Sequence, residues 1–254
     1  MASNMSVGTL HLSTDHHERM ADYAEHYYTF VNDPDAFLVA ELISKHMTGR
    51  KVLDMGCGPV HPIHMLFLRN ARETVGHDVD QENLDFVSSC KENGQILKNQ
   101  LSALKYLYFY ILKQPLPSNP EKVIRDCYDR IKTLRQGSLV ERVKGYKNAF
   151  DSVMEIGSFG GLHSVDEFKQ AVSNAHSYLR RGGIFLMVNW LQPRYRKNPY
   201  LFNGRVVSLI QASDYPAILK KARFKLISLD ETSRVSKPTR DLGYKSIVYA
   251  VAKK

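Results

Sequence analysis

Hydrophobic and polar positions along the chain form short apolar runs that alternate with longer amphipathic stretches. The apolar runs predict buried strands within KVLDMGCGPVHP, ETVGHDVDQENL, KYLYFYILK, FDSVMEIGS, IFLMVNW, FKLISLD and YKSIVYAVAKK. Helices are predicted at HPIHMLFLRNA, NLDFVSSCKENG, NPEKVIRDCYDRIKTLRQG, SVDEFKQAVSNAHSYLRRGG and DYPAILKKARF. Strands and helices that alternate in this way predict an α/β fold built on a doubly wound sheet, closed by a final pair of strands.

Several residues predict where individual helices begin and end. Asn119 is placed as an N-cap with Pro120 in the first helical position, and Ser164 with Glu167 predicts a capping box. Glycines after 164–181 predict a helix stop there, and the polar loop between the last two strands is expected to be mobile surface. No repeat or linker interrupts the pattern, so 254 residues predict one domain.

Composition excludes several classes of protein. Hydrophobic residues make up 43% and charged residues 24%, which is ordinary for a globular chain. No apolar run approaches the roughly 20 residues of a membrane-spanning helix, and the start lacks the apolar core of a signal peptide. Three widely spaced cysteines fit neither a disulfide framework nor a metal site. We expect a cytoplasmic, monomeric protein with no membrane partner and no bound metal.

The net charge of +9 is concentrated in the middle of the chain. Residues 91–150 contain 12 Lys and Arg against 5 acidic residues, with tyrosines at 106, 108, 110, 128 and 146. Such a segment can bind phosphate and stack on bases, so an enzyme that acts on RNA stays an alternative. The strand-like alternation of KYLYFYILK argues for burial instead, which makes nucleic acid an unlikely partner.

A glycine turn followed by an acid predicts an adenosine site. Gly56 and Gly58 in LDMGCGP let the backbone approach a ligand at the carboxyl end of the first strand. Asp78 follows Gly56 by 22 positions, where the second strand should end, and a carboxylate there can accept both ribose hydroxyls. The short G-C-G and the closing pair of strands favour S-adenosyl-L-methionine as cofactor, with S-adenosyl-L-homocysteine as product, over NAD.

These motifs, with HDVDQENL and RRGGIFL, resemble class I methyltransferases. More narrowly, DYAEHYYTF is similar to the N-terminal segment of the nicotinamide, phenylethanolamine and indolethylamine N-methyltransferase family, and the likeness runs from about residue 22 to the C-terminus. The resemblance implies a Rossmann-like seven-stranded core at 49–254, an N-terminal helical lid at 1–48, and a helical, basic insertion at about 91–148 between the second and fourth strands. It also implies methyl transfer to a nitrogen of a small-molecule amine or N-heterocycle.

The resemblance also implies roles for individual residues. For the cofactor these are Tyr23, Tyr28, Gly56, Cys57, Gly58, Asp78, Asn83, Gln136 and Ile156. For the substrate they are Tyr27, His163, Asn189, Trp190 and Tyr195, and the catalytic candidates are Tyr23, Glu155 and Asn189. An aromatic face attracts a cation, which suits tyrosines beside a sulfonium. A carboxylate at Glu155 can hold an amine, take its proton or contact the cofactor, and simple solvation at a strand end is the alternative. For the tyrosines the alternative is packing of an amphipathic helix onto the sheet.

The chain departs from the family pattern at two acids. Several relatives have Asp where this chain has Asn189, and asparagine cannot neutralise a cation. The family's adenine-contacting Asp falls near Gln136–Ser138, where no carboxylate exists and Gln136 or a backbone carbonyl takes its place. A positively charged acceptor is therefore less secure, and a fold that binds the cofactor without catalysis stays a further alternative.

Overall fold

A computed structural model describes residues 24, 29–31, 33–192, 201–202, 205–206, 210–241 and 243–254. Seven strands form one sheet in the order β3-β2-β1-β4-β5-β9-β8. The five strands from β3 to β5 run parallel, and β9 pairs antiparallel with both β5 and β8. The strands of the sheet are β1 (Lys51–Met55), β2 (Glu73–Asp78), β3 (Ile131–Gln136), β4 (Phe150–Ile156), β5 (Leu179–Leu191), β8 (Lys225–Thr232) and β9 (Ser246–Lys253). This order confirms the predicted fold class.

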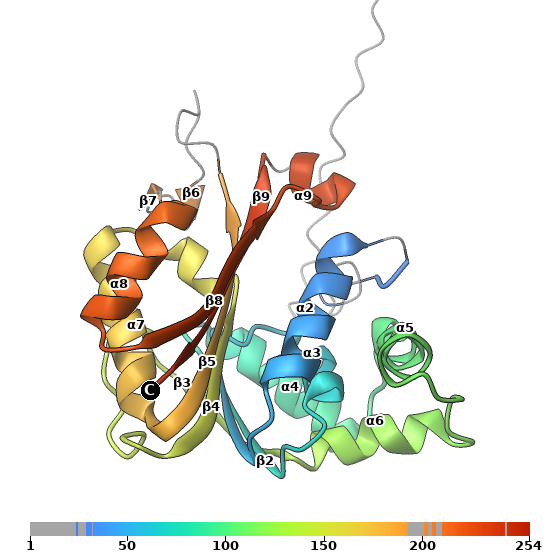
Figure 1. Cartoon of the computed structure of the whole chain (residues 1–254). Helices are drawn as coiled ribbons and strands as arrows, with labels where there is room; N and C mark the ends of the chain where they lie inside the picture. Colours follow the sequence, from blue (N-terminus) through green and yellow to red (C-terminus); the bar gives the residue numbers. More distant parts are fainter. Residues whose placement is uncertain are drawn as a thin grey trace, which may run out of the picture.

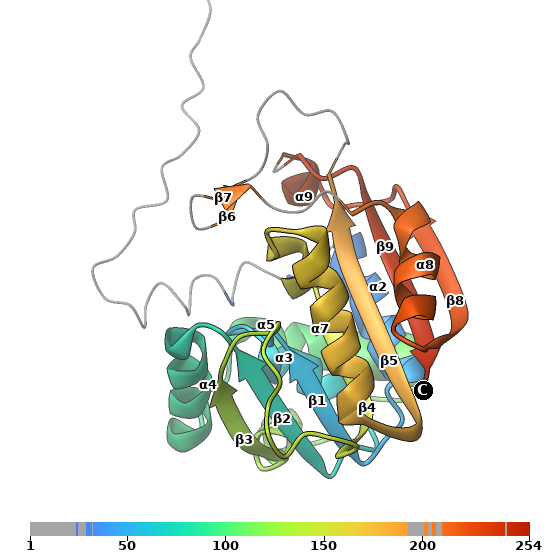
Figure 2. The ribbon, with the colours of Figure 1, turned by 90° about the vertical axis from the view of Figure 1, so that its left-hand side faces the viewer.

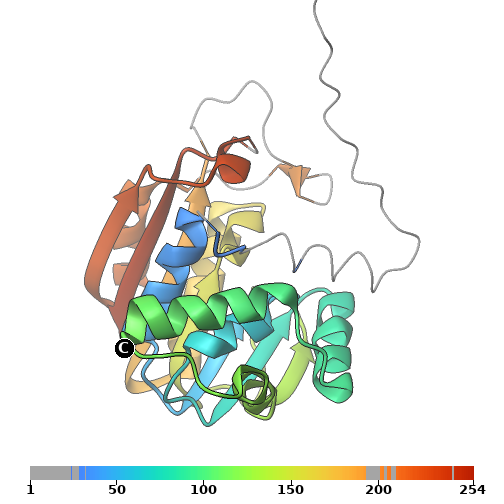
Figure 3. The same cartoon turned by 90° about the vertical axis from the view of Figure 1, so that its right-hand side faces the viewer.

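Helices cover both faces of the sheet (Figure 1). One face carries α2 (Pro34–His46), α3 (His61–Phe67), α4 (Gln81–Asn93), α5 (Lys98–Tyr106) and α6 (Pro120–Tyr128). The other carries α7 (Val165–Tyr178) and α8 (Tyr215–Lys221), with a short 3-10 turn η2 (Ser158–Gly161) after β4. Figure 2 views the α7 side and Figure 3 the α2 and α5 side. The remaining elements are η1 (Leu107–Leu112), η3 (Ala212–Asp214), α9 (Lys237–Asp241) and the two-stranded pair β6 (Leu201–Phe202) and β7 (Arg205–Val206).

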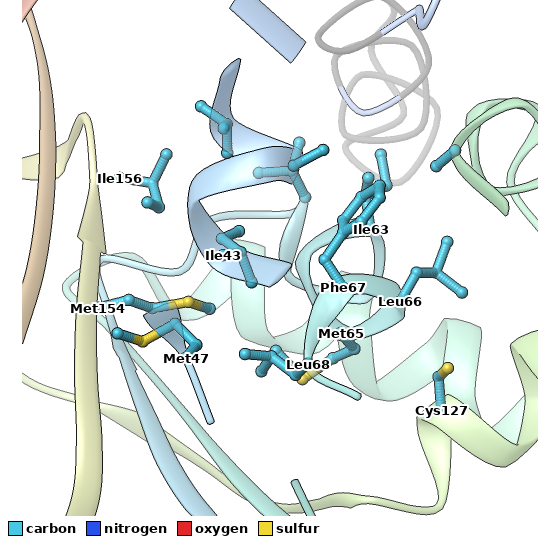
Figure 4. Packing of buried hydrophobic residues seen from close by; sticks show 14 of the residues in the cluster. Ile43, Met47, Ile63, Met65, Leu66, Phe67, Leu68, Cys127, Met154 and Ile156 are labelled. Carbon is cyan, nitrogen blue, oxygen red and sulfur yellow. The ribbon is translucent and has the colours of Figure 1, made fainter. Parts of the chain in front are cut away.

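Two hydrophobic clusters fill the layers on either side of the sheet. Figure 4 shows part of the first, where side chains of α2 and α3 meet Met154 and Ile156 of β4. All three cysteines are buried and none forms a disulfide. No helix in the described ranges is both long enough and apolar enough to cross a membrane.

The prediction of a strand at KYLYFYILK is wrong. The segment completes α5 and then forms the π-helix η1. Ala103, Leu104 and Leu107 are buried at helical spacing, whereas Phe109 and Tyr110 are exposed. Tyr106 stacks on Phe37 of α2, with ring centroids 4.5 Å apart. Tertiary contacts with α2 therefore override the strand propensity of the aromatic residues.

Three predicted boundaries also change. The helix predicted at 119–137 ends at Tyr128, and β3 follows at Ile131–Gln136, so the third strand comes later than expected. Helix α7 ends at Tyr178, and 179–183 already belong to β5 rather than to a glycine stop. The loop between β8 and β9 contains the short helix α9. Asn119 and Ser164 do cap α6 and α7, each accepting a backbone N–H, as predicted.

Candidate active site

The glycine turn after β1 is tied to the end of β2. Gly58 N–H donates to Asp78 Oδ2 at 2.8 Å, and Gly56 N–H donates to the His77 carbonyl at 2.6 Å. Both glycines have positive φ, +70° and +56°. A Cβ on Gly56 would lie 2.1 Å from Ser158 Cβ, whereas a Cβ on Gly58 would meet nothing within 4 Å. The backbone at Gly58 is thus open to a ligand, and the backbone at Gly56 is packed against η2.

Asp78 has most of its acceptor sites occupied within the protein. Besides Gly58, its carboxylate accepts from the Asp80 N–H at 2.9 Å and from Asn83 Nδ2 at 3.2 Å. A carboxylate offers about four acceptor sites, so one stays available for a ribose hydroxyl, and the weak Asn83 contact can yield another. Burial raises the pKa of Asp78, an effect that the backbone donors oppose. The structure places Asn83 beside Asp78, and its implied role, near the ribose or near the cofactor's carboxylate, stays a prediction.

A residue that the sequence analysis missed lies beside this acid. Val79 is 56% exposed at the strand end, and Gln136 Nε2 donates to its carbonyl at 3.3 Å. Gln136 ends β3 directly opposite Asp78 in the sheet register. An exposed valine and an amide next to the acid suit a flat, polar-edged base such as adenine. The sequence signal that could have identified Val79 is an apolar residue directly after the acid, at a predicted strand end.

Cys57 enters the site only through its backbone. Its side chain is buried, and its Sγ would lie 3.0 Å from a Cβ on Gly76 of β2. Burial raises the pKa of the thiol well above its usual range, with Asp54 and Asp78 adding to the effect. The thiol therefore points into the sheet layer, away from the ligand edge.

A buried carboxylate that contacts two histidines lies in β1, two residues before Gly56. The sequence alone did not indicate this cluster. Asp54 Oδ2 contacts Nδ1 of His61 at 2.8 Å and Nδ1 of His64 at 3.1 Å. Burial alone would raise the pKa of Asp54, but the two histidines outweigh it and lower the pKa to about 2. The two histidines thus hold the carboxylate in its ionised form and join the end of β1 to α3.

Glu155 is buried beneath the carboxyl ends of β4 and β5. It is 0% exposed, and Oε1 accepts from the Phe159 N–H at 2.8 Å and lies 3.2 Å from Ser158 Oγ. Oε2 accepts from Asn189 Nδ2 at 2.9 Å. Burial raises the pKa of Glu155 to about 8. The carboxyl reaches the neighbouring cavity only through Asn189, so its role as a proton acceptor stays a prediction.

A small cavity opens beyond Asn189. It measures about 20 Å³, enough for one water-sized group, and its wall residues are Phe159, Gly160, Phe168, Asn189, Trp190, Leu191, Gln192, Ile210, Gln211, Tyr215 and Tyr244. The predicted substrate residues Asn189 and Trp190 therefore share one cavity, next to aromatic walls. Tyr215 and the Phe159–Gly160 turn were missed, because no pattern in the sequence marks α8 or η2 as neighbours of β5. Gln192, directly after β5, was also missed.

Two other predicted residues lie elsewhere. Ile156 is 8% exposed and packs in the hydrophobic cluster against α2 and α3 (Figure 4). His163 follows η2, and its backbone N–H donates to Glu167 Oε2 at 2.8 Å. Neither side chain lines the cavity. Their assigned roles stay predictions, and for Ile156 only the backbone is placed to contact a ligand.

The tyrosines predicted for the lid, Tyr23, Tyr27 and Tyr28, and the wall residue Tyr195 lie outside the described residues. Ala24, within the same stretch, is described and fully buried. Its carbonyl accepts from Asn99 Nδ2 of α5 at 3.0 Å. The DYAEHYYTF stretch is thereby attached at Ala24 to the helix that replaced the predicted strand.

The comparisons with known proteins bear on the fold. No family model matches the chain, and no curated protein matches it. Among solved structures, the 1,6-didemethyltoxoflavin-N1-methyltransferase of Burkholderia thailandensis, with bound 1,6-didemethyltoxoflavin and S-adenosylhomocysteine, aligns with a TM-score of 0.57. The identity is 13%, over 94% of this chain and 86% of that one. The N-methyltransferase NodS of Bradyrhizobium japonicum WM9, in complex with S-adenosyl-l-homocysteine, aligns at 0.56 and 12%, over 94% and 99% of the chains.

The chain has the class I methyltransferase fold. At these identities the likeness concerns the fold alone, and a further neighbour is the [4+2]-cyclase SpnF, at a TM-score of 0.58 and 15% identity over 86% of this chain and 80% of that one. One fold hosts several chemistries, so the activity must be argued from the site. The narrower resemblance to the nicotinamide, phenylethanolamine and indolethylamine N-methyltransferases stays a prediction.

Proposed function

We propose that the protein is an S-adenosylmethionine-dependent methyltransferase that methylates a nitrogen of a small-molecule amine or N-heterocycle. The observation that carries the proposal is the glycine turn, fixed to Asp78 and open at Gly58, at the same sheet edge as a cavity with aromatic walls and a few polar groups. Both features lie at the carboxyl edge of the parallel strands, where ligands bind in open α/β sheets. The solved N-methyltransferases of this fold support the proposal by analogy.

The residues present fit the cofactor. Asp78 and Asn83 would hold the ribose, and Val79 and Gln136 would contact the adenine. The backbone of 56–58 would hold the methionine end. The bound cofactor supplies an activated methyl group on a sulfonium. The chain's own residues then have to align the acceptor nitrogen, exclude water and receive any proton that the acceptor releases.

The tyrosine-rich basic segment does not support an RNA substrate. Tyr106, Tyr128 and Tyr146 are buried in the hydrophobic clusters and cannot stack on bases. Tyr110 is exposed, but it stacks on Tyr106 and has Lys113 over its ring at 5.9 Å. The composition that suggested base stacking is therefore used for packing.

Cofactor binding tests the first half of the proposal. We expect S-adenosylhomocysteine to bind the full chain in isothermal titration calorimetry, and Asp78→Ala to weaken that binding by about tenfold or more, because the ribose hydroxyls lose a charged acceptor. Asp80→Ala is the matched control, since it removes a neighbouring carboxylate that caps α4. Absence of heat in the unmodified protein would contradict the proposal.

A further inference from the structure

We propose that Glu155 is a positioning residue that fixes the Asn189 amide with its carbonyl toward the cavity, so that the pocket selects a methyl acceptor carrying an N–H or O–H donor. That the ligand is a methyl acceptor rests on the proposed function, whereas the hydrogen-bond geometry of the pocket does not. Glu155 has one partner whose hydrogen-bonding role cannot change, the backbone N–H of Phe159.

The Phe159 backbone fixes which oxygen of Glu155 accepts a hydrogen bond. A backbone N–H can only donate, so Oε1 of residue 155 must be a hydrogen-bond acceptor in every protonation state. The second group near Oε1 is Ser158 Oγ, at 3.2 Å, which also lies 2.9 Å from the Met55 carbonyl. A hydroxyl has one proton and cannot donate to both oxygens at once.

This arrangement accommodates a neutral Glu155 without moving Asn189. When Ser158 donates to the Met55 carbonyl, its oxygen can accept a proton carried on Oε1. Oε2 then stays a hydrogen-bond acceptor, as it is in the ionised form. Burial raises the pKa of Glu155 to about 8, so the neutral form prevails at neutral pH. In the ionised form, and in the neutral form with its proton on Oε1, Oε2 faces Asn189 as a hydrogen-bond acceptor.

The orientation of the Asn189 amide follows from its hydrogen bond with Glu155 and decides which amide atom faces the cavity. Its Nδ2 donates to Glu155 Oε2 at 2.9 Å, which turns Oδ1 toward the η2 side of the cavity. A Cβ on Gly160 would lie 3.6 Å from Oδ1, so glycine leaves that oxygen accessible to a small group. Among the residues that line the cavity, Asn189 Oδ1, Gln192 Oε1 and the Tyr215 hydroxyl are buried without a hydrogen bond of normal geometry, and the Tyr215 hydroxyl lies close enough to the Asn189 amide to interact with it.

The occupant follows from these groups. The Tyr215 hydroxyl has one proton and can donate to only one of the two carbonyl oxygens, so at least one of them still requires a donor. The cavity of about 20 Å³ has room for one such group, and Phe159, Phe168 and Trp190 supply aromatic walls around it. A buried carbonyl left unpaired is costly, so a ligand without a donor is rejected. The fitting class is a flat ring that bears an amino, ring N–H or hydroxyl group.

Substitution of Glu155 by glutamine should reverse the selection. In Glu155→Gln the amide oxygen must still face the Phe159 N–H, which leaves the NH₂ group toward Asn189. Asn189 then turns its own oxygen to that NH₂ and presents Nδ2 to the cavity. Aniline and pyridine N-oxide are suitable probes, because each places one polar atom on a six-membered ring, as a donor in aniline and as an acceptor in the N-oxide.

Binding of the two probes to the full chain, measured by NMR titration without cofactor, tests the inference. We expect the unmodified protein to prefer aniline by about tenfold, the equivalent of one unpaired buried group, and Glu155→Gln to prefer pyridine N-oxide. Ser158→Ala should keep the preference for aniline, because the Phe159 N–H still orients residue 155. Equal binding, binding of neither probe by the unmodified protein, or an unchanged preference in Glu155→Gln would overturn the inference.

Two further measurements separate a failure of Glu155→Gln to fold from a failure of the inference, and a failure of the inference from a failure of the proposed function. If thermal melting shows that Glu155→Gln does not fold, Asn189→Ala replaces it and should abolish the preference for aniline, whereas a retained preference would overturn the inference. Separate titration with S-adenosylhomocysteine tests the proposed function. A protein that shows the reversal of preference but does not bind the cofactor product would retain this inference and lose the proposed function.

Discussion

Trp190 donates its indole N–H to Oδ2 of Asp35 at 3.0 Å, which joins the end of β5 to the first turn of α2. Asp35 also accepts from the backbone N–H of Ser236 at 2.7 Å and from the hydroxyls of Ser236 and Thr239. One buried carboxylate thus connects α2, the cavity wall at Trp190 and the segment before β9. The position of that wall depends on a residue 155 positions away in the sequence.

Removal of this carboxylate should loosen the wall. Asp35→Ala leaves four donors without their partner, and we expect the free energy of unfolding to fall by about 3 kcal/mol. Trp190 is the only tryptophan in the chain, so its fluorescence reports this position directly, and we expect a red shift. Asp33→Ala is the control, because Asp33 caps α2 and accepts from the Thr29 backbone, and loss of such a cap costs about 1 kcal/mol. An unshifted spectrum in Asp35→Ala would contradict the account.

The two glycines of the turn should respond differently to alanine. At Gly56 both the positive φ and the contact with Ser158 Cβ oppose a side chain, so Gly56→Ala should destabilise the fold by at least about 2 kcal/mol. At Gly58 only the positive φ opposes it, and about 1 kcal/mol is expected. Gly58→Ala should instead weaken S-adenosylhomocysteine binding more than it weakens the fold. Chemical denaturation and calorimetry separate the two effects, and similar profiles for both variants would argue against the assignment.

Glu155 should make the protein less stable as pH rises toward 8. Its folded pKa is raised from 4.5 to about 8 by burial, so the folded state retains a proton that the unfolded chain has released. Between pH 6.5 and 8 this costs about 2 kcal/mol, and the loss levels off above pH 8. The slope should be absent in Glu155→Gln. Urea denaturation at a series of pH values measures it, and equal slopes in both proteins would show that the carboxyl ionises freely.

His77 should have the opposite effect in a lower pH range. Burial, with help from Arg135, lowers its folded pKa from 6.5 to about 4, so the unfolded chain binds a proton that the folded state does not. Stability is therefore lost as pH falls from 6.5 to 4. We expect this loss to be smaller by about 3 kcal/mol in His77→Leu. Tyr146→Phe changes the ring that packs against His77 without removing a group that titrates there, and it should keep the full loss.

Local patterns were sufficient to predict much of the fold. The run into Gly56, the acid at Asp78 and the caps at Asn119 and Ser164 each act over a few residues, and the structure shows the turn and both caps. The strand predicted at 105–113 failed because contacts with Phe37, from a distant helix, decide its conformation. The third strand was missed because most of its side chains are exposed, which leaves no apolar pattern.

The candidate site was predictable only where it follows a strand end. Asp78, Glu155 and Asn189 could be placed at one sheet edge because parallel strands end there. Their neighbours could not be predicted, since Phe159, which donates to Glu155, and Tyr215, which lines the cavity beside Asn189, come from η2 and α8, whose packing no sequence periodicity encodes. The burial of Glu155 likewise depends on how the helices and turns pack over the sheet edge, which the sequence pattern does not specify. The sequence therefore identified the residues of the edge and left their orientation undetermined.

Transfer of a labelled methyl group tests the central claim most directly. The full chain would be incubated with methyl-labelled S-adenosylmethionine and a panel of small amines, pyridines and indoles, with RNA as comparator and Asp78→Ala as the inactive control. The account predicts label on the nitrogen of one small-molecule class, none on RNA, and little in the variant. Label on RNA alone, or no transfer to any acceptor by a protein that binds the cofactor, would contradict it.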